Sequence, residues 1–124
     1  MNNEEPQNNR RYKRIKKHFI LTYFDLNDPA KKHEASQLKN ISLGGICVIT
    51  AQPYPESTKL GIELKTPLIS ELTHLEGTVL GSHERVKDII YETRVEFDPL
   101  SNQAKFVLNN LIEHFDKQER DNHE

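Results

Sequence analysis

Short apolar runs separated by turn residues dominate the first hundred positions of the chain. Some runs are rich in β-branched and aromatic residues, and others alternate between apolar and polar side chains, as half-buried strands do. We predict six short strands on this basis, at 18–24, 34–41, 46–50, 59–65, 75–85 and 89–97. The segment 34–41 is the most polar of the six, and the last two segments form a long hairpin.

The C-terminal part of the chain has a helical period instead. Apolar residues in 104–115 recur at intervals of three and four, which places them on one stripe of a helix. Asp98-Pro99 or Ser101 can begin this helix, since proline suits a first turn and Asp or Ser accepts hydrogen bonds from free amides there. A mainly β fold satisfies the pattern best, with a small antiparallel barrel and the helix across one opening.

Length and composition indicate one small domain with polar ends. A chain of 124 residues supports one modest core. We expect a disordered tail at 1–9, the domain at 10–117 and a charged, frayed tail at 118–124. No apolar run approaches the roughly 18 residues that would span a membrane, and the N-terminus lacks the apolar segment of a secretory signal. Together with the single cysteine, this predicts a cytoplasmic protein.

Positive charge is concentrated in one segment, residues 10–17, which we call the basic arm. The formal net charge is −2, yet six of the 17 lysines and arginines lie in the arm, and no acid does. The rest of the chain therefore holds 11 basic residues against 19 acidic ones. A short basic arm on an acidic body favours a compact anionic partner over a long polyanion.

The sequence offers little for catalysis or metal binding. The six histidines are scattered, without the close ligand pairs of structural zinc sites. Cys47 lies between Ile46 and Val48 with no adjacent charge to lower its pKa, which is typical of a core cysteine. The motifs of nucleophile elbows, P-loops and dinucleotide-binding folds do not occur in the sequence. We expect no enzymatic activity, no cofactor and no metal.

Two stretches have binding chemistry, the basic arm and the turn at 40–45. In the arm, Arg10 and Arg14 offer flat guanidinium forks that bind phosphate and the O6 and N7 edge of guanine. In the turn, two adjacent glycines permit unusual backbone angles and the close approach of a ligand. Asn40 and Ser42 add short polar side chains that can bond a turn or a ligand. Taken separately, a solvated tail and an ordinary turn explain both stretches.

Taken together, Arg10-x-x-x-Arg14 and Asn40-x-Ser42-x-x-Gly45 resemble the signature of the PilZ domain, a bacterial receptor module for cyclic di-GMP. That signature is RxxxR followed by D/N-x-S-x-x-G at the start of a strand, and all five of its positions are present here. The resemblance extends over roughly the whole of the predicted domain. It implies a six-stranded, split β-barrel with a C-terminal helix, and cyclic di-GMP as the ligand.

The resemblance also implies roles for the matched residues. The arginines would bind phosphates and guanine edges, the polar residues of the turn would bond a guanine or the backbone that holds it, and the glycines would keep the start of the strand open. The implied ligand-binding residues are Arg10, Arg11, Arg14, Asn40, Ser42, Gly44 and Gly45. Asn40 is uncharged where many family members have aspartate, which weakens its attraction for guanine N–H donors.

The resemblance predicts a non-enzymatic sensor whose arm folds over cyclic di-GMP and signals to an effector protein of unknown identity. Two alternatives stay open. One is a PilZ-like protein-interaction module that has lost nucleotide binding, although the intact arginines count against it. The other is a small β-barrel that binds RNA or single-stranded DNA through the arm. Such sites add exposed aromatic platforms, whereas the arm offers only Tyr12. Nucleic acid is therefore the less favoured partner, and the lack of a long apolar run predicts no membrane insertion.

Overall fold

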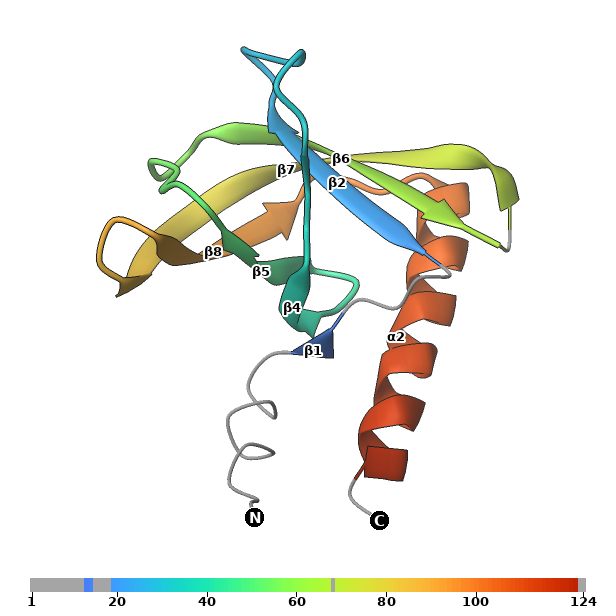
Figure 1. Ribbon diagram of the computed structural model, residues 1–124. Helices are drawn as coiled ribbons and strands as arrows, with labels where there is room; N and C mark the ends of the chain where they lie inside the picture. The colour runs from blue at the N-terminus through green and yellow to red at the C-terminus, as the bar shows by residue number, and fades with distance from the viewer. Residues whose placement is uncertain (1–12, 15–18, 68, 123–124) are drawn as a thin grey trace, which may run out of the picture.

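One antiparallel sheet forms most of the protein (Figure 1). The computed structural model describes residues 13–14, 19–67 and 69–122. Within them the strand order is β1-β4-β5-β8-β7-β6-β2-β3. Six strands have five residues or more: β2 (Ile20–Asp25), β4 (Gln37–Ile41), β5 (Gly45–Thr50), β6 (Lys59–Thr66), β7 (Ile69–Val86) and β8 (Ile90–Phe97). Two-residue strands, β1 (Lys13–Arg14) and β3 (His33–Glu34), lie at the two ends of the sheet.

The sheet curls because one long strand belongs to both of its walls. The first part of β7 pairs with β6, and its second part pairs with β8. Register shifts between Val79 and Gly81 and between Glu84 and Val86 bend this strand, as bulges do. The two ends of the sheet, β1 and β3, do not pair with each other in the described part of the chain. The predicted mainly β, six-stranded antiparallel split barrel is confirmed, with two short strands added to it.

The core fills the inside of the curled sheet and extends onto the C-terminal helix. Helix α2 (Asn102–Asn122) crosses one end of the sheet (Figure 1). It buries the first part of its predicted apolar stripe, Ala104, Val107, Leu108 and Leu111. These side chains belong to one cluster with the inward-facing residues of the strands, among them Phe19, Leu21, Leu38, Val48, Leu60, Ile62, Leu64, Val79 and Val95.

Ser101 caps the helix, and it is one of the two starts that the sequence predicts. Its Oγ accepts a hydrogen bond from the N–H of Ala104 at 3.1 Å, which satisfies a free amide of the first turn. Asp98, at the alternative start, instead accepts hydrogen bonds from Lys59 Nζ at 3.0 Å and Thr78 Oγ1 at 3.2 Å. The helix continues to Asn122, so residues 118–122 of the expected frayed tail are helical. The expected tail at 1–9 lies outside the described residues.

Tyr23 packs in an aromatic group at the inner side of β2. Its ring stacks on that of His33, with 5.4 Å between centroids, and meets Tyr54 edge-on at 6.2 Å. Burial raises the pKa of Tyr23 to about 12, and the neighbouring Tyr54 acts in the same direction, against a backbone hydrogen bond at Ala51. The folded domain therefore holds the Tyr23 phenol in its neutral form.

We expect the free energy of unfolding to fall as the pH rises from about 10 to 12. The unfolded chain releases the tyrosine proton near pH 10, whereas folded Tyr23 retains it, so alkaline pH favours unfolding by at most about 2–3 kcal/mol. Urea denaturation of wild type and Tyr23→Phe across this range measures the effect. The variant should lose less stability than wild type, and equal losses in both would contradict the assignment.

Candidate functional site

The turn predicted to bind a ligand joins β4 to β5 and is closed by its own hydrogen bonds. The Ser42 N–H donates to the Gly45 carbonyl at 2.9 Å. The Ser42 Oγ accepts hydrogen bonds from the N–H groups of Gly44 at 3.1 Å and Gly45 at 3.3 Å. The hydroxyl oxygen of Ser42 is therefore engaged within the turn, and its direct effect is to hold the backbone in shape.

The two glycines of the turn lie in different surroundings, and only one of them is required by packing. The prediction that these glycines adopt unusual backbone angles is wrong, because neither has a positive φ. A Cβ added at Gly45 would overlap the carbonyl oxygen of Val95, since β8 passes directly against this position. A Cβ at Gly44 would meet nothing closer than the Ser42 Oγ, at 3.6 Å. Gly45 is thus required by the packing of β5 against β8, and Gly44 faces open space.

Removal of the Ser42 hydroxyl should weaken the turn. Ser42→Ala leaves the N–H groups of Gly44 and Gly45 without their side-chain acceptor, and because the turn is exposed, water replaces it in part. We expect a loss of about 1 kcal/mol in the free energy of unfolding, measured by chemical denaturation. Leu43→Ala is the neighbouring control. A Ser42→Ala variant as stable as wild type would show that these hydrogen bonds are energetically silent.

Asn40 lies on the outer face of the sheet. It is exposed and pairs with Cys47 of β5, next to a register shift in β4. Directly opposed residues of antiparallel strands project to the same face, and the next pair, Ile41 with Ile46, projects towards the core. Among the described residues, no hydrogen bond engages the Asn40 side chain. Its amide is available to a ligand.

The basic arm pairs with this part of the sheet through Lys13 and Arg14, the part of the arm that the structure describes. Strand β1 pairs with β4, with Lys13 opposite Leu38 and Arg14 opposite Gln37. Figure 1 shows β1 beside the start of β4, close to the β4–β5 turn. The backbone of Arg14 is thereby placed within three residues of Asn40 along the neighbouring strand. The predicted site residues Arg10 and Arg11 lie outside the described residues.

Charged side chains gather around Cys47 on the same outer face. Glu92 of β8, whose side chain is nearly buried, forms ion pairs with Lys39 at 3.2 Å and Arg85 at 3.3 Å. Cys47 is buried as predicted, but it lies on this face and not in the apolar cluster. Burial raises the pKa of its thiol, and Glu92 adds to the effect, against the nearby cations Lys39, Arg94 and Arg85. The reactive thiolate form is disfavoured.

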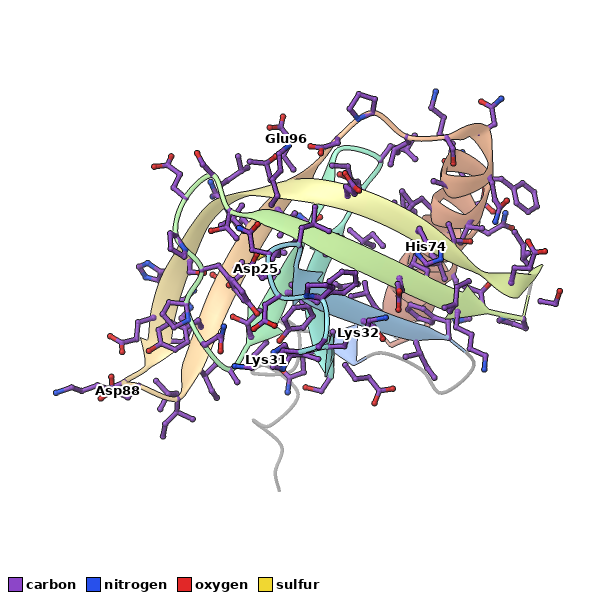
Figure 2. The ribbon with its side chains drawn as sticks, turned by 90° about the horizontal axis from the view of Figure 1, so that it is seen from above. Asp25, Lys31, Lys32, His74, Asp88 and Glu96 are labelled. Atoms are coloured by element: carbon purple, nitrogen blue, oxygen red, sulfur yellow. The ribbon has the colours of Figure 1, made fainter. Side chains whose placement is uncertain are left out.

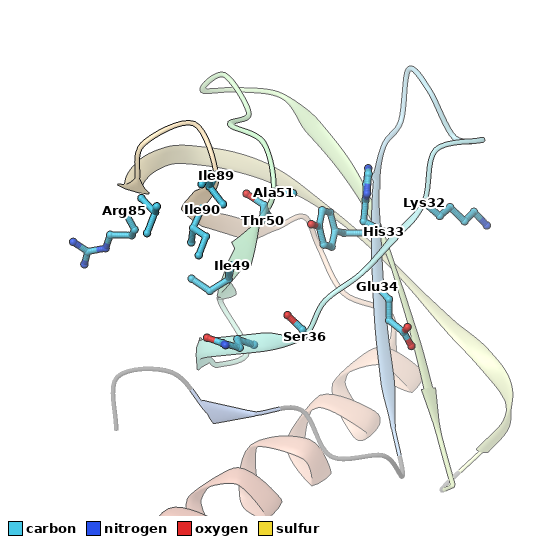
Figure 3. A pocket seen from close by; sticks show the side chains of 13 residues that line it. Lys32, His33, Glu34, Ser36, Ile49, Thr50, Ala51, Arg85, Ile89 and Ile90 are labelled. Atoms are coloured by element: carbon cyan, nitrogen blue, oxygen red, sulfur yellow. The ribbon is translucent and has the colours of Figure 1, made fainter. Parts of the chain in front are cut away.

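A separate groove of about 650 Å³ lies at the far end of β5 (Figure 3). β5 begins at the turn with Gly45 and ends in this groove with Ile49 and Thr50. Lys32 and Arg85 stand on its rims and extend away from its centre, towards Glu63 and Glu92, respectively. The predicted ligand-binding residues in the turn do not line this groove.

Some of the other charged side chains lie near the ends of strands and in turns. Figure 2 shows Lys31 and Lys32 near the β2–β3 turn, and Asp88 and Glu96 towards opposite ends of β8. Among the described residues, no three His, Cys, Asp or Glu side chains come together to hold a metal ion. In the same part of the chain, no helix has both the length and the apolar character needed to cross a membrane.

Comparison with known proteins identifies a family and a similar fold. The model of the PilZ domain family matches residues 8–114. Among solved structures, the Bacillus subtilis inhibitor of motility MotI/DgrA superimposes with a TM-score of 0.60 over 88% of this chain, at 16% sequence identity. The chain covers 52% of that protein's length, so it spans about half of it. None of the curated protein sequences matches the chain at a significant level.

Proposed function

Since this chain belongs to the PilZ domain family, we propose that it binds cyclic di-GMP between its N-terminal arginines and the β4–β5 turn. The family is one of cyclic di-GMP receptor domains. The observation that supports the proposal most directly is the pairing of β1 with β4, which holds Arg14 beside the strand that carries Asn40. The second arginine of the RxxxR half of the signature thus lies in the same region of the sheet as Asn40.

The residues of this region suit a dinucleotide with two phosphates and two guanines. Guanidinium groups of Arg10, Arg11 and Arg14 can bind phosphate oxygens and the guanine O6 and N7 in bidentate fashion. The exposed amide of Asn40 offers both a donor and an acceptor to a guanine. Ser42, Gly44 and Gly45 would act mainly through the backbone, because Ser42 fixes the turn against which the ligand lies.

The proposed mechanism is a clamp with one fixed half and one that closes on the ligand. The β4–β5 turn is the fixed half, held by its internal hydrogen bonds and by β8. The arginines of the arm close over the ligand, and charge-assisted hydrogen bonds of about 1.5–3 kcal/mol each offset the cost of ordering them. Binding reshapes the surface around β1, which an effector protein can read.

The test is a titration of the protein with cyclic di-GMP in which the backbone amide chemical shifts are monitored by NMR. We expect the largest shifts at residues 13–14 and 38–47, around the arm and the turn. Saturating shifts confined to the groove at the end of β5 would contradict the proposed site, and the absence of any shift would contradict the function.

A salt titration distinguishes this proposal from a nucleic-acid binder. An RNA or single-stranded DNA site would lose affinity steeply with salt, because many phosphates release counterions on binding. A ligand with two phosphates has a shallow dependence. We therefore expect the affinity for cyclic di-GMP to change little with salt and an oligonucleotide to bind weakly. Tight, strongly salt-dependent binding of the oligonucleotide would favour the alternative.

A further inference from the structure

The register of the sheet places Arg94 on the same face as Asn40. Asn40 of β4 is opposite Cys47 of β5, and Cys47 is opposite Arg94 of β8. Directly opposed residues share a face, so the three side chains form one row across the sheet. Neighbouring strands lie about 4.8 Å apart, which puts the Asn40 and Arg94 backbones about 10 Å apart. A purine ring and the two side chains together span that distance.

Arg94 is available to a ligand, whereas the neighbouring cations are engaged. Lys39 and Arg85 both form ion pairs with Glu92. Arg94 is exposed, and among the described residues no hydrogen bond or ion pair involves its guanidinium. The Arg94 guanidinium and the Asn40 amide are therefore both free to bind a ligand that reaches across the row.

The residues directly opposite Arg94 on its two neighbouring strands leave room beside it. On β7, the residue opposite Arg94 is Gly81, and a Cβ added there would meet no atom within 4 Å. On the other side of Arg94, Cys47 is small and lies almost completely buried. The row of Asn40, Cys47, Arg94 and Gly81, which we call the ledge, therefore carries Arg94 as its exposed cation, with the exposed Leu80 at its border. Such a ledge fits a planar ring that stacks on, or lies edge-on to, the guanidinium.

We propose that Arg94 binds the guanine base held at Asn40 and makes the site selective for guanine over adenine. The proposal rests on the proposed function and adds to it a residue outside the sequence signature. A guanidinium donates two hydrogen bonds to the guanine O6 and N7. Adenine presents an N6 amino donor in place of O6, so one of these hydrogen bonds is lost and two donors face each other. Arg94 is thus a specificity-determining residue of the ledge.

The experiment measures the affinities of wild type, Arg94→Met, Arg94→Lys and Lys65→Met for cyclic di-GMP and cyclic di-AMP. Lys65 is exposed on β6, so Lys65→Met removes one positive charge from elsewhere on the sheet. We expect Arg94→Met to weaken cyclic di-GMP binding by about tenfold or more, and Lys65→Met by less than about twofold. Arg94→Lys should reduce the preference for guanine while retaining part of the affinity, because lysine keeps the charge but not the fork.

A second variant tests the ledge without altering charge. Gly81→Leu should fold, because its side chain enters open space and Gly81 has no positive φ, yet it should obstruct the ligand and weaken binding. Denaturation curves of all variants confirm equal folding. If wild type binds cyclic di-GMP and the Arg94 variants bind it with unchanged affinity and selectivity, the role of Arg94 is overturned while the proposed function stands. If wild type does not bind, the proposed function fails, and the role of Arg94 with it.

Discussion

Replacement of Gly45 by alanine should destabilise the domain by about 3 kcal/mol, whereas alanine at Gly44 should leave its stability nearly unchanged. A Cβ at Gly45 overlaps the Val95 carbonyl oxygen and comes within 3.1 Å of its carbon and 3.2 Å of the Glu96 Cα. All three atoms belong to the backbone of β8, so rotation of a side chain cannot relieve the overlap. The strands must move apart instead.

That movement would disturb the hydrogen bonds that join β5 to β8. The Phe97 N–H donates to the Gly44 carbonyl at 2.8 Å, next to the pair formed by Gly45 and Glu96. Urea denaturation of Gly44→Ala and Gly45→Ala gives the comparison, since the two variants add the same methyl group to adjacent residues. Equal stability of the two variants would show that β8 does not constrain the turn.

Arg14→Ala should weaken cyclic di-GMP binding by about 100-fold or more while leaving the fold stable. A bidentate contact to phosphate or guanine contains two charge-assisted hydrogen bonds, each of about 1.5–3 kcal/mol. The pairing of β1 with β4 involves the backbone of Arg14, which alanine retains. The variant should therefore unfold at the same temperature as wild type.

Lys13→Ala is the matched control for this variant. It removes one positive charge from the adjacent residue of the same two-residue strand and keeps the backbone that pairs with β4. We expect calorimetric titration to give a loss of at most a few-fold for Lys13→Ala. Similar losses for the two variants would indicate a general effect of charge and would contradict a specific contact at Arg14.

The sequence pattern predicts an element of this fold well where the signal lies within the segment itself. The alternation in 59–65 and 89–97 corresponds to β6 and β8, and Ser101 begins the helix through its own side chain. The pattern fails where the chain changes its pairing partner within one segment. The segment 34–41 reads as one strand, but Ala35 and Ser36 lie between β3, which pairs with β2, and β4, which pairs with β5. Local composition contains no signal for that change of partner.

In the candidate site, too, the sequence predicts local features but not those that depend on the pairing of distant strands. The signature identifies Asn40 and Ser42, and the structure places both at the end of β4 and in the turn that follows. The reason for Gly45 depends on β8, some fifty residues further along the chain, so the sequence suggested backbone freedom where the cause is close packing. The sequence does not assign Arg94 to the site for a related reason, because only the register of β4, β5 and β8 shows that it shares a face with Asn40.

Isothermal titration of the wild-type chain with cyclic di-GMP decides whether this chain is a cyclic di-GMP receptor, as we propose. We expect saturable binding with a dissociation constant of tens of micromolar or tighter, and the same titration gives the number of ligands bound per chain. A flat titration at those concentrations, with a chain shown to be folded, would contradict the proposal.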